Sequence, residues 1–179
     1  LILLFLMCCS CAFCQNEINF IYINGSNTND EKNKQWFFNG VAKFHTVLTK
    51  RINSDEFMSK KLLEDSRYSI ASEPSYLFWG DLTKCQIERL NEDINILKRT
   101  SPRLAQFTRR FISMCFHDAI WISKFQNMLP VLDMLQEQVL ASAKNGDKVV
   151  LMGYSAGTFV TYQYFLTRLP VVKIEKMTA

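Results

Sequence analysis

Three short apolar runs, each closed by turn residues, predict buried strands. They span Ile18–Ile23, Ser75–Trp79 and Lys148–Met152, and all three are rich in β-branched, aromatic or other large apolar residues. The first run ends in an Asn-Gly-Ser-Asn cluster, and each of the other two is followed by glycine. Continuous apolar runs of this length are typical of strands that are covered on both faces, as in a parallel sheet.

Helical spacing of apolar residues predicts that the segments between these strands are helices. One such stripe consists of Val131, Leu132, Leu135, Val139 and Leu140. The Asn145-Gly146 pair ends this helix, because both residues tolerate a left-handed cap. Upstream, Ser101-Pro102 is a helix-start signal, and we expect the helix it begins to continue until Pro130 interrupts it. Strands alternating with helices predict an α/β fold, in which helices flank a parallel sheet.

The domain organisation follows from the ends of these patterns. Residues 1–14 are predicted to be a signal peptide, because they contain an apolar run too short to span a bilayer and then small residues at cleavage spacing. Residues 15–179 form one predicted domain, with a helical crossover at about 85–144 that either packs outside the sheet or caps the site. We therefore expect an exported protein (secreted, periplasmic or cell-surface). A lipid anchor on Cys8 or Cys11 is the alternative that attaches it to a membrane.

Composition excludes several classes of function. The net charge of +4 is too small and too evenly spread to indicate a nucleic-acid partner. The basic stretch at 98–110 is either a solvated helix face or a contact for an anionic surface or substrate. Beyond the predicted signal peptide there is neither a CxxC motif nor a His-rich cluster, so neither a metal nor an organic cofactor is expected. The two cysteines beyond the signal peptide, Cys85 and Cys115, either pair in an oxidising compartment or stay as separate buried thiols.

The segment with the clearest chemistry is Gly153-Tyr154-Ser155-Ala156-Gly157. It directly follows the third strand and precedes a predicted helix over 158–168, which is the strand–turn–helix context of a nucleophile elbow. Serine at so tight a turn has a strained backbone, and Gly153 and Gly157 avoid a steric clash two positions away. The N-terminus of the following helix favours a developing negative charge. A close-packing turn without a catalytic role is the alternative.

On this motif and its context, the chain resembles the α/β-hydrolase superfamily in its serine esterase and lipase branch. The resemblance implies that Ser155 is the nucleophile and that the N–H of Ala156 is one donor of an oxyanion hole. It places a second donor, the N–H of Ser26, in the loop after the first strand, where Gly25 lets the backbone approach closely. Asn24 stands where the family more often has His, and a plain Asn-Gly turn is the alternative. The family's strand order puts the first strand between the other two.

The sequence does not complete a catalytic triad in the family's order of Ser, acid and His. The residues after Ser155 include Glu175 but no His. We therefore expect the acid and the His to lie beyond residue 179, in a chain truncated at both ends, since it also lacks an initiator Met. Within the chain, His117 is the candidate base, against a packing or capping role. Neighbouring side chains on a helix diverge, so Asp118 is not expected to orient it.

The resemblance implies a hydrolase that cleaves a carboxylic ester, or a related acyl bond, through an acyl-serine intermediate. Its substrate is then a small-molecule or lipid ester. Two other functions stay open on the same scaffold. One is a non-catalytic exported binding protein, and the other is an acyltransferase that uses the same nucleophile and excludes water from the second step.

Overall fold

A computed structural model describes five segments of the chain, 16–25, 31–63, 67–109, 117–143 and 147–168. The strands are β1 (Asn16–Ile23), β2 (Tyr68–Ile70), β3 (Ser75–Leu77) and β4 (Lys148–Gly153). The helices are α1 (Glu31–Ser54), α2 (Glu56–Leu62), α3 (Lys84–Thr100), α4 (Pro102–Thr108), α5 (His117–Ser123), α6 (Phe125–Ser142) and α7 (Ala156–Thr167), with a short 3-10 turn η1 (Gly80–Thr83). The predicted signal peptide lies outside the described residues.

The four strands form one parallel sheet with β1 at its centre. Strand β4 pairs with β1 along one side, from Ile18 opposite Lys148 to Ile23 opposite Gly153. On the other side β2 pairs with the first part of β1 and β3 with its last part. The predicted position of the first strand between the other two is therefore confirmed, and so is the α/β class with helices flanking a parallel sheet.

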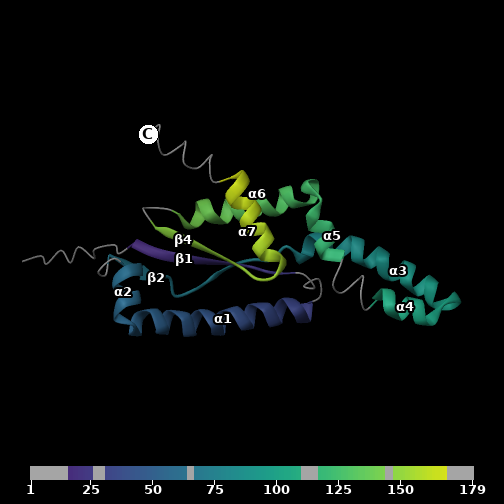
Figure 1. The fold of residues 1–179 in the computed structure, drawn as a ribbon, viewed down its shortest axis with the longest axis horizontal. Coiled ribbons are helices and arrows are strands. Elements are labelled where there is room, and N and C mark those ends of the chain that lie inside the picture. The colour runs from purple at the N-terminus through teal and green to yellow at the C-terminus, as the bar shows by residue number, and fades with distance from the viewer. Residues whose placement is uncertain (1–15, 26–30, 64–66, 110–116, 144–146, 169–179) are drawn as a thin grey trace, which may run out of the picture.

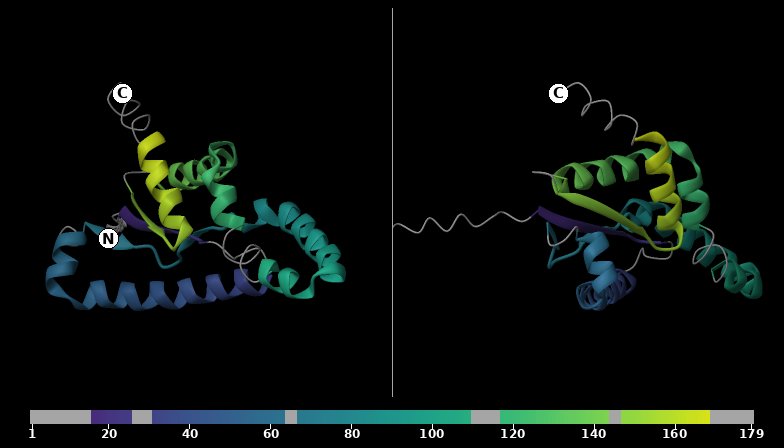
Figure 2. Two further views of the ribbon diagram at one scale, coloured as in Figure 1. Left: turned by 45° about the vertical axis from the view of Figure 1, so that its right-hand side comes forward. Right: turned by 60° about the vertical axis from the view of Figure 1, so that its left-hand side comes forward.

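Helices cover both faces of this sheet (Figures 1 and 2). Helices α1 and α2 lie on one face, and α6 and α7 lie on the other. Side chains alternate along β1, because successive residues of a strand point to opposite faces. Phe20 and Tyr22 therefore pack towards α1, whereas Ile21 and Ile23 join the core under α6 and α7. We call these two sides the α1 face and the α6–α7 face.

The crossover between β3 and β4 consists of several helices. Helices α3 and α4 project past the carboxyl end of the sheet (Figure 1). The expected helix break at Pro130 was wrong, because Pro130 lies inside α6. The break falls at Lys124, whose backbone is extended (φ −80°, ψ 119°), and the carbonyl of Trp121 in α5 is satisfied by Asn127 Nδ2 at 2.8 Å.

Two further sequence-based expectations need correction. The short strand β2 was not predicted, because three residues give too little alternation to recognise. Cys85 was expected to be buried or in a disulfide, but it is an exposed free thiol on α3. Its proposed partner, Cys115, lies outside the described residues.

Candidate functional site

Ser155 occupies the turn between β4 and α7, at the carboxyl end of the sheet. Its backbone has φ 53° and ψ −120°, and it is the one non-glycine residue with a positive φ in the described segments. Such a conformation costs on the order of 1–3 kcal/mol and persists only when the surrounding structure holds it in place. Two hydrogen bonds close the turn, from Gly157 N to Tyr154 O at 2.9 Å and from Thr158 N to Ser155 O at 3.0 Å. The side chain of Ser155 is exposed.

The two glycines of the motif permit this turn by letting backbone segments touch. A Cβ on Gly153 would lie 2.5 Å from the carbonyl of Gly157, and a Cβ on Gly157 would lie 2.4 Å from the carbonyl oxygen of Ile23. Both distances are far below a van der Waals contact. The motif glycines therefore have the steric role that the sequence predicted.

The loop after β1 presses directly against the elbow. A Cβ on Gly25 would meet both the Cβ of Ser155 and the carbonyl oxygen of Tyr154 at 2.8 Å. The amide of Tyr154 also donates to the carbonyl of Ile23 at 3.0 Å, which continues the β1–β4 ladder into the turn. The structure thus brings together the two loops that the sequence placed at the same sheet edge. Ser26, the predicted second oxyanion donor, lies outside the described residues.

Asn24 holds this loop against the end of β3. It is fully buried, and its Nδ2 donates to the carbonyl of Gly25 at 2.9 Å. Its Oδ1 accepts the backbone N–H of Trp79 at 2.8 Å, and its carbonyl accepts the Trp79 indole N–H at 2.9 Å. Asn24 therefore positions the loop through a side-chain amide that both donates and accepts a hydrogen bond. A histidine ring does not carry a donor and an acceptor in the same arrangement.

Trp79 connects the loop to the crossover helices. The indole is fully buried and stacks on Trp121 of α5, with ring centroids 6.0 Å apart and ring planes 7° apart. Helix α5 carries the candidate base. One buried side chain thus links the loop beside Ser155 to the helix that begins at His117.

His117 and Asp118 are in contact, contrary to the sequence expectation. His117 Nδ1 lies 3.2 Å from Asp118 Oδ1, and Asp118 is buried. Both residues belong to the first turn of α5. Among the described residues, neither His117 nor any other side chain makes a hydrogen bond to Ser155 Oγ.

The remaining predicted oxyanion donor lies at the N-terminus of α7. The N–H of Ala156 belongs to the first residue of α7 and has no acceptor in the described segments. The first amides of a helix carry a partial positive charge, so this N–H suits an anionic oxygen. Asp81, also at the carboxyl edge, is tied to α1 by an ion pair with Lys34 at 2.8 Å. That hydrogen bond raises the pKa of Lys34.

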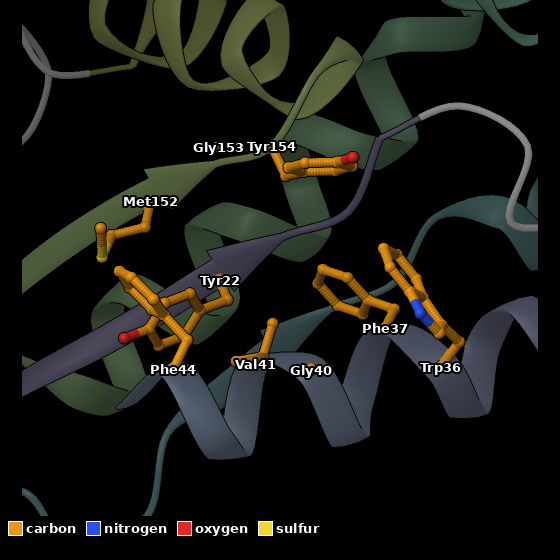
Figure 3. A pocket seen from close by; sticks show the side chains of 9 residues that line it. All are labelled: Tyr22, Trp36, Phe37, Gly40, Val41, Phe44, Met152, Gly153 and Tyr154. Atoms are coloured by element: carbon orange, nitrogen blue, oxygen red, sulfur yellow. The ribbon is translucent and has the colours of Figure 1, made fainter. Parts of the chain in front are cut away.

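Next to the elbow, a pocket of about 370 Å³ lies between α1 and the sheet (Figure 3). Its side chains come from the three elements around it, and they include Tyr22, Trp36, Phe37, Val41, Phe44 and Met152. The backbone of Gly153 and the side chain of Tyr154 complete the wall on the elbow side. The sequence analysis missed this pocket. The available signal was Trp36, Gly40 and Phe44, which recur every four residues and so share one face of a helix.

A buried polar pair closes the pocket from inside. Tyr22 Oη lies 3.1 Å from His45 Nδ1, and His45 Nε2 lies 2.9 Å from the carbonyl oxygen of Ala71. Burial raises the pKa of Tyr22 to about 12, with a smaller contribution from Tyr76. His45 is buried because α1 packs this side of the helix on the sheet.

Comparison with known proteins adds no relative, since no family model, curated protein or solved structure matches this chain. Within the described segments, no three His, Cys, Asp or Glu residues gather as a metal site would require. None of the described helices is both long and apolar enough to cross a bilayer. The function is therefore proposed from the geometry around Ser155.

Proposed function

We propose that the chain is a serine hydrolase of the α/β-hydrolase type, with Ser155 as the nucleophile that attacks a carboxylic ester or related acyl bond. The observation that carries this proposal is the backbone of Ser155, strained at φ 53° and ψ −120° and exposed at the end of β4. A connection between β4 and α7 does not by itself require a strained residue. A nucleophile at this position does, because the strained backbone presents the serine hydroxyl above the edge of the sheet.

The proposed reaction has two steps. Ser155 Oγ attacks the carbonyl carbon and gives its proton to a base, and the tetrahedral oxyanion then expels the alcohol, which takes that proton. Water next attacks the acyl-serine, releases the carboxylic acid and restores the Ser155 hydroxyl. The free N–H of Ala156 lies at the N-terminus of α7, where it would stabilise the oxyanion in both steps. The N–H of Ser26 stays the proposed second donor.

His117 is the candidate base inside the chain, and its Nδ1 contact with buried Asp118 supports this role, because a carboxylate on Nδ1 leaves Nε2 to accept a proton. The family's order instead favours a His that follows the nucleophile. Export remains part of the proposal, since residues 1–14 have the composition of a signal peptide.

One observation favours a second function, a non-catalytic binding protein on the same scaffold. Ser155 Oγ makes no hydrogen bond to a base in the described segments. A serine hydroxyl without such a partner is a poor nucleophile at neutral pH. Strain at Ser155 would then persist as a feature of the scaffold alone.

Labelling with a fluorophosphonate probe separates these two functions. We expect the folded protein to be labelled at Ser155, and Ser155→Ala to lose all labelling. Ser54→Ala is the matched control, because Ser54 is an exposed serine at the far end of α1 and should leave labelling unchanged. Absence of labelling on wild-type protein that is folded by circular dichroism would favour the binding scaffold.

The base is tested with the same probe. His117→Gln removes the proton acceptor but keeps a polar side chain of similar size. Loss of labelling in folded His117→Gln assigns the base to His117, whereas retained labelling assigns it to another residue. Peptide mapping of the labelled site should identify Ser155 in every variant that reacts.

A further inference from the structure

The pocket beside the elbow has the size and chemistry of a ligand site. Its volume of about 370 Å³ falls in the range of small-molecule sites, which start at roughly 300 Å³. Its lining is almost entirely aromatic and aliphatic (Figure 3). Trp36 and Phe44, at its two ends, are 65% and 48% exposed, so the pocket is open to solvent and to a ligand.

Gly40 keeps the floor of the pocket clear. A Cβ at this position would meet no atom within 4 Å, although Gly40 lies in the middle of a long helix. Glycine in a helix interior costs roughly 1 kcal/mol relative to alanine. The space above Gly40, between Trp36 and Phe44, is therefore left open on the helix that forms one wall (Figure 3).

The buried polar side chain of the pocket wall, Tyr22, is already hydrogen-bonded. The carbonyl of Ala71 can only accept, so His45 Nε2 carries the proton and Nδ1 accepts one from Tyr22 Oη. The hydroxyl of Tyr22 thus donates to His45 and not to a ligand. Because the lining is almost entirely apolar, a polar ligand would lose most of its hydration here without replacement, which makes an uncharged apolar group the favoured occupant.

The pocket and the candidate nucleophile share one piece of backbone. Gly153 and Tyr154 line the pocket, and Ser155 follows them directly. Consecutive Cα atoms are about 3.8 Å apart, so Ser155 Cα lies within roughly 7.6 Å of Gly153 Cα. The ring of Tyr154 borders the elbow side of the pocket (Figure 3), and Tyr154 is 59% exposed.

We propose that this pocket binds the acyl chain of the ester substrate, with the ester carbonyl at Ser155 and an unbranched aliphatic chain extending past Tyr154 towards Gly40. The proposal rests on the proposed function. It adds the substrate class, an ester of a medium-length aliphatic acid, and it makes the residues on α1 determinants of chain length.

The first experiment measures binding without catalysis. Butanol, hexanol and octanol are titrated into Ser155→Ala protein, and the shift of tryptophan emission to shorter wavelength, as the alkanol displaces water from exposed Trp36, reports occupancy. Each buried methylene contributes about fourfold in affinity, so hexanol should bind roughly sixteenfold more tightly than butanol. Gly40→Leu, added to this background, fills the pocket and should weaken octanol binding at least tenfold, by about 1.4 kcal/mol or more.

The control places the same leucine elsewhere on the helix. Val47 is exposed on α1 outside the pocket, so Val47→Leu should bind octanol as the parent does. Thermal unfolding confirms that each variant is folded. Affinity that does not rise with chain length, or that Gly40→Leu leaves unchanged, would overturn the pocket as the binding site.

The second experiment tests whether the acyl chain of the ester is the group that occupies the pocket. If the acyl chain enters the pocket, wild-type protein should hydrolyse the p-nitrophenyl ester of octanoic acid with a higher kcat/KM than the acetate, and Gly40→Leu should reverse that preference. An unchanged preference would overturn the acyl assignment. If the proposed function is wrong but the pocket binds aliphatic chains, the outcome differs. Alkanols would still bind Ser155→Ala protein, and the fluorophosphonate probe would not label the wild-type protein.

Discussion

The two faces of the sheet are built from the same strands but are packed in opposite ways. On the α6–α7 face, the side chains that meet are fully buried, among them Ile21, Leu132, Leu135 and Val160. On the α1 face, aromatic side chains surround an open pocket, and Phe44 remains half exposed. Alternation along β1 allows one strand to serve both environments.

The two faces of the sheet therefore have different roles. The closely packed face fixes α7 against β1 and β4, and thereby holds the strained turn at Ser155. The looser face carries space that no side chain of the described segments fills. Close packing and strain occur together because a strained residue persists only where its surroundings leave it no alternative.

The largest single loss of stability is expected when a fully buried side chain is truncated. Leu132→Ala should destabilise the protein by about 4 kcal/mol, because Leu132 is fully buried and its removal leaves a cavity. Phe44→Ala, on the α1 face, should cost about 1 kcal/mol, since that ring already borders open space. Urea unfolding measures both. Equal losses would contradict the contrast in packing.

Replacing glycine by alanine tests the same contrast in packing, because it adds a methyl group instead of removing side-chain atoms. Gly157→Ala should destabilise by about 3 kcal/mol, because its methyl group meets backbone carbonyls of β1 and of Asn24 that cannot move aside. Gly40→Ala is the matched change on the α1 face and should stabilise by up to about 1 kcal/mol through helix propensity. A destabilising Gly40→Ala would mean that the floor of the pocket is not open.

A loss of stability smaller than those of Leu132→Ala and Gly157→Ala is expected on the α1 face at high pH. The pKa of Tyr22 is raised to about 12 in the folded chain, from 10.0. Below pH 10 both states keep the proton, so this contribution to stability is fully present. As pH rises from 10 to 12, the unfolded chain releases the proton first, and stability falls by about 2 kcal/mol.

Urea unfolding across this pH range checks the prediction. Tyr22→Phe should reduce the pH dependence, and it should also be less stable at neutral pH because it loses the hydrogen bond to His45. Tyr162→Phe is the matched control, since Tyr162 is exposed on α7 and should keep the wild-type profile. An unchanged slope in Tyr22→Phe would show that another group causes the loss.

The sequence by itself determined the features that depend on neighbouring residues. The three main strands, their parallel arrangement and the strand–turn–helix at Gly153–Gly157 were recognisable from apolar runs, turn residues and local spacing. These features depend on residues within a few positions of one another, and the sequence displays such relations directly. The central position of β1 and the approach of Gly25 to the turn were instead implied by the resemblance to the α/β-hydrolase superfamily.

Only the tertiary structure decided which distant side chains meet. The burial of His45 against Tyr22, the bonds of Asn24 to Trp79 and the stack of Trp79 on Trp121 each join residues from separate elements. The pocket exists only because α1 crosses the sheet beside β4. Packing of this kind depends on the distances and angles between whole elements, and a one-dimensional pattern does not contain them.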